Sequence, residues 1–469
     1  MKSRILFLTM MILIIPSLAF PYKKVKCFVL KPPQQVLEGV QRIAVMDFST
    51  EGSSAGDTPD NTEEIALKIL SKVVDKQIGS DDDDEITIQY GKSFSGSLIS
   101  ALIEPNRGIE KIKTGFLGMG KGEEGKTLQE GTFTNVFEIV ERDRLMQVLK
   151  EQELSMSGLI NENQAMEIGN MLGVQAVIMG DVNFFFQDDD YKEKRTEKKN
   201  KKKITKMVDC TRRKVNVTVK ARIISAETGQ VLGSTEAKES LEKSQCEDRY
   251  GSLPSVDEMI NTCLDKAVPQ IANYIAPYYE LESFELEKIE VKKHKKNGEK
   301  AAELAEKLKI NKAYLIYKAI YDKDMYNPEV MYNLGVMNEV VGNFDDAAEF
   351  YQMAQQLKDE GRFRDAIKRT EKNILFADAL ARMGVEIVEH QFVVTEAATA
   401  AAMAGKVKTK GSRDDRISVY KEADGSSEVV TRVPGDLSFT VVRRINDWYL
   451  IKLLGGKEGY IHKDMVEQQ

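Results

Sequence analysis

Residues 120–127 match the phosphate-binding pattern G-x-x-x-x-G-K-T letter for letter. That chemistry requires a buried strand before the loop and a helix after it, so that backbone N–H groups point at the phosphates. The preceding residues 109–114 are too charged for a central parallel strand, and the β-rich residues 131–134 leave no room for a helix. Glu123 and Glu124 would also repel a phosphate. We therefore interpret the motif as a glycine-rich connector and expect no nucleotide or other cofactor.

The other reactive residue types form no catalytic or metal-binding pattern. The three histidines lie in different segments, which leaves neither a metal cluster nor a histidine-based nucleophile system. The acidic run 81–85 lacks the spaced, glycine-bent geometry of a calcium loop, so we interpret it as a solvated insertion. We expect no catalytic residues and no metal, and therefore a protein that is not an enzyme.

The first twenty residues predict export. Lys2 and Arg4 precede an apolar run over residues 5–15, and residues 17–19 supply the small side chains of a cleavage site after Ala19. The apolar run is too short for a stable membrane anchor. We expect residues 1–19 to be a cleaved signal peptide. The mature protein would then be exported from the cytoplasm.

Lipidation of Cys27 is an alternative way to place the mature chain at a membrane. Cys27 lies a short tether ahead of the first expected core strand, and acylation there would require cleavage directly before it. However, Lys24 and Lys26 occupy positions at which a lipidation motif needs small or apolar residues. We therefore favour cleavage without lipidation.

The charge balance limits the classes of partner. The chain of 469 residues has 67 Lys or Arg and 74 Asp or Glu, which gives a net charge of −7. This length predicts several domains, and this balance gives no field that would attract nucleic acid. In an exported protein we interpret the basic run 192–206 as a solvated tip, with contact to anionic lipid headgroups as the alternative. We expect no nucleic-acid partner.

Two of the four cysteines can meet across a hairpin. Residues 215–223 alternate between apolar and polar side chains, as in a half-buried strand, and residues 227–230 form a turn. The simplest register of the return strand places Cys210 opposite Glu247, whereas one bulge places it opposite Cys246. Export permits disulfides, so we predict a Cys210–Cys246 bond, with two free thiols as the alternative.

Residues 137–182 have the clearest pattern of elements in the chain. A short apolar run meets the charged elbow 141–144, two helical patterns follow, and after Gly173 a buried strand begins near Ala176. Together with an earlier strand over residues 42–48, this order resembles the curli-secretion (CsgG-type) family. The resemblance covers roughly residues 41–282 and rests on the segments RIAVMDF, VERDRL, LKEQELSMSGL and LGVQAVIMGDV. It implies a CsgG-type α/β domain over residues 41–284, preceded by an N-terminal tether over residues 20–40.

The same resemblance raises the question of a pore. Curli-secreting members of the family form oligomeric outer-membrane pores, to which each protomer contributes two β-hairpins. Here the corresponding segments, residues 184–215 and 233–259, carry charges at adjacent positions and so on both strand faces. A lipid-facing Lys or Arg costs about 2–4 kcal/mol at the bilayer midplane. We therefore expect the periplasmic fold without the pore.

A helical repeat pattern follows the CsgG-type domain. Two groups of side chains recur thirty-four residues apart: Ala313, Tyr317 and Ile320, then Ala347, Tyr351 and Ala354. The spacing resembles the tetratricopeptide repeat, whose paired helices often hold a peptide. We predict helical repeats over residues 285–390, with Tyr317 and Tyr351 as candidate partner-binding residues. A purely structural spacer is the alternative.

The C-terminal part of the chain is rich in β-strand patterns. After a linker over residues 391–415, short strands separated by glycine-bearing turns predict a small all-β barrel over residues 416–469. Its G-D, W-Y and G-Y-I segments resemble the bacterial SH3-like domain, which often binds cell-wall peptides or proteins. Trp448 and Tyr460 are the candidate binding residues.

These observations predict an α+β protein that works by binding. By resemblance we expect a non-enzymatic, homo-oligomeric scaffold in the periplasm, peripheral to the outer membrane. It would belong to a curli-type secretion or envelope-assembly system and bind envelope proteins through its repeats and C-terminal barrel. One alternative is a subunit of an oligomeric outer-membrane secretion channel. The other is an envelope protein that binds peptidoglycan.

Overall fold

The computed structural model describes residues 22–54, 83–112, 123–140, 162–199, 202–395, 399, 405–453 and 457–468. The predicted signal peptide and the first helical pattern after the charged elbow lie outside these residues. The chain divides into two compact units. One contains Cys27–Glu282 and Glu371–His390, and the other contains Ser283–Thr370 and Gln391–Gln469 together with the residues up to Lys26. No helix in the described part of the chain is long and apolar enough to cross a membrane.

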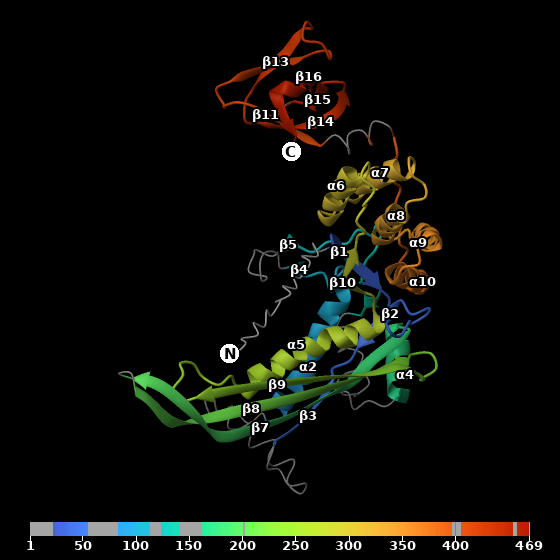
Figure 1. Ribbon diagram of the computed structural model, residues 1–469. Coiled ribbons are helices and arrows are strands. Elements are labelled where there is room, and N and C mark those ends of the chain that lie inside the picture. The colour runs from blue at the N-terminus through green and yellow to red at the C-terminus, as the bar shows by residue number, and fades with distance from the viewer. Residues whose placement is uncertain are drawn as a thin grey trace, which may run out of the picture. The chain divides into compact units, whose positions relative to one another are not determined.

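The unit around Cys27–Glu282 is built on a mixed sheet (Figure 1). Its strands are β2 (Arg42–Val45), β3 (Ser49–Ser54), β6 (Glu138–Ile139), β7 (Ala176–Lys199), β8 (Lys202–Ser225) and β9 (Val231–Cys246). The order is β6-β2-β7-β8-β9, and β3 also pairs with β7. The strands β6, β2 and β3 run parallel to their partners, while β7, β8 and β9 form antiparallel ladders. The last three strands therefore form a long meander.

Both faces of this sheet are covered near β2. Ile43 and Val45 pack with the helices α2 (Asp83–Ile103) and α5 (Val256–Ile275). Ala44 lies in a second core with the helix α4 (Glu162–Leu172). Alternate residues of a strand face opposite sides, so an apolar strand needs cover on both. The helical pattern there places residues 165, 168, 171 and 172 on one apolar face, and in α4 residues 165, 168 and 172 are buried, but Met171 is 46% exposed and does not belong to that core.

The predicted N-terminal tether is partly a strand. β1 (Lys24–Lys31) pairs with β10 (Tyr278–Glu285) in a two-stranded sheet. Phe28 and Leu30 of β1 pack against Tyr279 and Leu380. The Cys27 side chain is fully buried, so an acyl chain on its sulfur would require β1 to move. Burial of this apolar segment explains why residues 24–31 are ordered in a ladder.

Five helices follow in the region that we predicted to be repeats. They are α6 (Lys295–Glu306), α7 (Ile310–Tyr321), α8 (Pro328–Val341), α9 (Phe344–Leu357) and α10 (Gly361–Arg382). The Asn327 side chain caps α8, and Gly342 ends it with φ +97°. Residues 371–390 nevertheless belong to the unit of the mixed sheet, because Leu380 and Val385 pack with Phe28. The helices are present, while their kinship with tetratricopeptide repeats stays a prediction.

The C-terminal strands form one antiparallel seven-stranded sheet. They are β11 (Lys406–Thr409), β12 (Arg416–Tyr420), β13 (Val429–Pro434), β14 (Ser438–Ile445), β15 (Trp448–Lys452), β16 (Glu458–His462) and β17 (Val466–Gln468). The order is β13-β12-β16-β15-β14-β11-β17, and among the described residues the two end strands do not pair. The expected closed barrel is therefore corrected to an open sheet. β11 lies within the predicted linker, where Val407 joins the core of this sheet.

Candidate functional site

The described part of the phosphate-like motif is a strand and a packed connector. Glu123 and Glu124 form β5, which pairs antiparallel with β4 (Lys111–Ile112). A side chain at Gly125 would clash with the Phe28 ring, and the Phe28 N–H donates a hydrogen bond to the Lys126 carbonyl over 2.9 Å. Residues 120–122 lie outside the described residues, and no helix begins within residues 123–140. This arrangement lacks the helix N-terminus on which phosphate binding depends.

A disulfide joins β8 to β9 in the structure. Cys210 and Cys246 lie directly opposite each other, with a Cα–Cα distance of 4.0 Å and an S–S distance of 2.00 Å. The register reaches this alignment through an irregularity between Ile223 and Ile224. The bulged register that the sequence left open is therefore the one in the structure.

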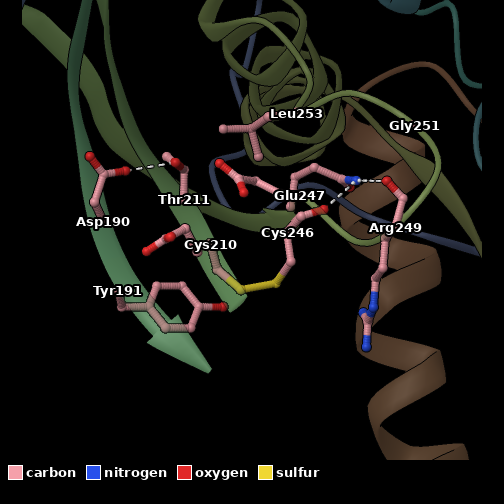
Figure 2. A pocket seen from close by; sticks show the side chains of 11 residues that line it. Asp190, Tyr191, Cys210, Thr211, Cys246, Glu247, Arg249, Gly251 and Leu253 are labelled. Carbon is pink, nitrogen blue, oxygen red and sulfur yellow. Dashed lines mark hydrogen bonds between the residues drawn. A yellow bond between two sulfur atoms is a disulfide. The ribbon is translucent and has the colours of Figure 1, made fainter. Parts of the chain in front are cut away.

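The disulfide borders an open pocket of about 570 Å³ (Figure 2). Carboxylates of Asp190, Asp209 and Glu247 line it, together with the basic residue Arg249. The Thr211 hydroxyl donates to Asp190 over 2.6 Å. A pocket of this composition can exchange hydrogen bonds with a polar group. It offers no free thiol for chemistry, because both of its sulfur atoms are held in the disulfide.

The disulfide sulfurs also lie near a carboxylate. Ligand atoms of Glu193, Cys210 and Cys246 lie within 4.8 Å of one another. Metal ligation needs thiolates, which the disulfide does not provide. The Arg195 guanidinium lies 3.1 Å from the Glu193 carboxylate and 3.4 Å from the Cys246 sulfur, where its charge opposes a cation. We therefore assign no metal to this cluster.

Two of the predicted partner-binding tyrosines are buried, which corrects their proposed role. Tyr317 and Tyr351 are both 0% exposed, and burial raises the pKa of each phenol well above its usual value. The Tyr351 hydroxyl donates to the buried Glu339 carboxylate over 2.7 Å, and Arg369 donates two hydrogen bonds of 2.7 Å to the same group. These tyrosines hold helices together, so they cannot contact a partner in this conformation.

The other two candidates share one face of the C-terminal sheet. Trp448 lies opposite His462, and Tyr460 lies opposite both Leu450 and Tyr420. The Trp448 ring meets those of Tyr420 and His462 edge to face, with centroid distances of 5.5 and 4.9 Å. The neighbouring residues Tyr449 and Ile451 point into the core on the opposite face. We call Tyr420, Arg443, Trp448, Tyr460 and His462 the aromatic face.

Exposure differs within the aromatic face. Trp448, Tyr420 and His462 are partly exposed. Tyr460 is only 8% exposed, and its hydroxyl accepts a hydrogen bond from Arg443 over 2.8 Å. Trp448 is therefore the main candidate for contact with a ligand. Tyr460 contributes by holding the Arg443 guanidinium through its hydroxyl.

Comparison with protein families identifies two parts of the chain. Residues 128–303 match the model of the curli production assembly/transport component CsgG, and residues 415–467 match the bacterial SH3 domain. The chain contains a CsgG domain and a bacterial SH3 domain. These two matches indicate an envelope-associated protein. The CsgG match begins after β2, so it covers less of the chain than the resemblance in the sequence predicted.

Three solved structures are similar to parts of the chain. The LpoB C-terminal domain from Salmonella enterica is 10% identical, with 43% of this chain and 83% of that chain covered and a TM-score of 0.17. Lipoprotein GNA1162 from Neisseria meningitidis is 11% identical, with coverages of 50% and 99% and a TM-score of 0.16. A putative neuraminyllactose-binding hemagglutinin homolog from Helicobacter pylori is 9% identical, with coverages of 51% and 86% and a TM-score of 0.18. These TM-scores are too low to support an argument. No curated protein matches the chain.

Sequence reasoning named Trp448 and Tyr460 but missed the rest of the aromatic face. Tyr420, Arg443 and His462 come from three other positions of the sheet, and only the strand register brings them together. The available signal was the alternation of side chains along β15. Trp448 and Leu450 lie on one face of the strand, and Tyr449 and Ile451 lie on the other.

Proposed function

We propose that this protein is a non-enzymatic scaffold of the cell envelope, located in the periplasm beside the outer membrane. In this proposal the CsgG domain supports self-association, and the SH3 domain binds a peptide of the cell wall or of a partner protein. The observation that carries it is the partly exposed Trp448, held between Tyr420 and His462 on the face away from the core.

The aromatic face has the composition of a peptide-binding surface. Tryptophan, tyrosine and arginine contribute more than other residues to the binding energy of interfaces. The Trp448 ring is fixed by two neighbouring rings, so little side-chain entropy is lost on binding. The Arg443 guanidinium, which donates to the Tyr460 hydroxyl, supplies a positive charge on the same face. We therefore expect a peptide that presents an apolar group together with a carboxylate.

The long hairpin favours a scaffold over a channel. Arg213 pairs with Asp188 at 2.6 Å, and Arg212 pairs with Asp189 at 3.4 Å. These adjacent positions of β8 face opposite sides of the sheet, so both sides carry charge. Insertion of this segment into lipid would remove several charges from water at high cost. A subunit of a secretion channel is the second candidate. Conductance of ions by the protein in a planar bilayer would support it.

Removal of the Trp448 side chain tests the binding role. We expect Trp448→Ala to weaken binding to purified sacculi or to a stem peptide by about tenfold or more, as for a central aromatic contact. Val430→Ala removes another exposed apolar side chain of the SH3 domain and should leave binding unchanged. Co-sedimentation and calorimetry measure both variants, and a pull-down from envelope extracts tests a protein ligand. Equal binding by wild type and Trp448→Ala in every assay would contradict the proposal.

A further inference from the structure

The sheet of the CsgG domain narrows to a two-stranded ribbon beyond the disulfide. β9 ends at Cys246, opposite Cys210, while β7 and β8 continue as a pair to Lys199 and Lys202. In Figure 1 these strand ends extend beyond α2 and α5. We call the described residues 192–199 and 202–209 the basic ribbon. They include eight Lys or Arg and three Asp or Glu, in a chain whose net charge is −7.

On one face of the basic ribbon, side chains pack on one another and form ion pairs. Residues that oppose each other in a ladder share a face. On this packed face lie Tyr191, Glu193, Arg195, Lys206, Val208 and Cys210. Val208 and the disulfide are buried, and Tyr191 packs on them. Arg195 lies 3.1 Å from Glu193 and 3.3 Å from Asp248, so its positive charge is balanced locally.

The other face, which we call the lysine face, carries exposed charge. The register pairs Lys194 with Met207 and Lys198 with Lys203. Lys194 and Lys203 are exposed, and Met207 is an exposed apolar side chain at 58%. Excess lysine beside an exposed methionine is therefore an unusual combination for a merely solvated tip.

We propose that the lysine face binds the anionic phospholipid surface of an envelope membrane. Phosphodiester groups would accept hydrogen bonds from the lysine ammonium groups, while the lysine stems and Met207 rest against the acyl boundary. The ribbon lies on this surface and does not cross it, because its packed face also holds charged groups. The disulfide fixes the base of the ribbon, so that the lysine face is presented in one orientation.

Vesicle binding by the full mature chain tests this inference. We expect binding to vesicles of phosphatidylcholine with phosphatidylglycerol and none to phosphatidylcholine alone. Each basic residue near such a surface contributes roughly fivefold to affinity, so Lys194→Glu with Lys203→Glu should weaken binding by about two orders of magnitude. Lys243→Glu with Lys266→Glu makes the same change of charge at exposed positions of β9 and α5 and should leave binding nearly unchanged. Circular dichroism verifies that both variants fold.

A fluorescence measurement locates the contact. Met207→Trp in a Trp448→Phe background places the single tryptophan on the lysine face. Its emission should shift to shorter wavelength with the anionic vesicles only. An unchanged emission, or equal binding by the two charge-reversal variants, would overturn the inference. Binding of inorganic polyphosphate without binding of vesicles would also overturn it and assign the ribbon to a soluble polyanion. Trp448→Ala should still bind vesicles. Failure of the peptide-binding proposal can therefore be distinguished from failure of the vesicle-binding one.

Discussion

Replacement of Arg369 by alanine is expected to destabilise the helical region by about 3–5 kcal/mol, the cost of breaking a buried ion pair by removing its cation. The Glu339 carboxylate is 1% exposed and accepts both hydrogen bonds of the Arg369 guanidinium. The Tyr351 hydroxyl also donates to this carboxylate, but it is neutral and does not balance the negative charge. Urea unfolding, combined with hydrogen exchange of amides in α8 and α9, measures the loss.

Two further variants give the Arg369 result a specific meaning. Arg364→Ala removes an exposed arginine from the same helix and should change stability by less than about 0.5 kcal/mol. Adding Glu339→Gln to Arg369→Ala removes the buried charge, so the double variant should be more stable than Arg369→Ala alone. A double variant as unstable as the single one would show that the guanidinium acts through packing.

Removal of the disulfide is expected to cost about 3–4 kcal/mol, since the crosslink closes a long loop in the unfolded chain. Cys210 and Cys246 are separated by 36 positions in the sequence. We expect Cys210→Ser with Cys246→Ser to lower the free energy of unfolding of the CsgG domain by this amount, measured by urea denaturation. The ribbon should then also lose protection from hydrogen exchange.

A reductant provides the control for the disulfide. It should destabilise the wild type and leave the double serine variant unchanged, because that variant has no disulfide to reduce. Non-reducing peptide mapping of protein recovered from the periplasm identifies the pairing directly. Recovery of Cys210 and Cys246 as free thiols would contradict both the bond and its expected contribution.

Local patterns predicted individual strands and helices better than they predicted what those elements contact. The thirty-four-residue spacing picked out Tyr317 and Tyr351, which lie in α7 and α9, but it could not show that both side chains are buried. The environment of Tyr351 depends on α8, where Gly335 allows the Tyr351 ring to approach the helix closely. Side chains that recur at such a spacing can therefore belong to the core rather than to a binding surface.

Two boundaries were missed for reasons visible in the chain. Val25 and Cys27 are buried and Lys26 is exposed, which is strand alternation. We interpreted residues 20–40 as an N-terminal tether and so missed β1. The linker prediction missed β11 because four residues give a weak pattern, although Val407 pairs opposite Phe439. In both cases the strand forms by pairing with a segment that is distant in the sequence, which a local pattern does not reveal.

Removal of the SH3 domain tests the division of roles most directly. The deletion should begin after Thr395, because Phe392 stacks on Tyr314 of α7 with a centroid distance of 3.8 Å and must be kept. We expect the shortened chain to stay folded and self-associated by light scattering, and to lose co-purification with sacculi and envelope proteins. Loss of self-association with full retention of those partners would contradict the proposed function.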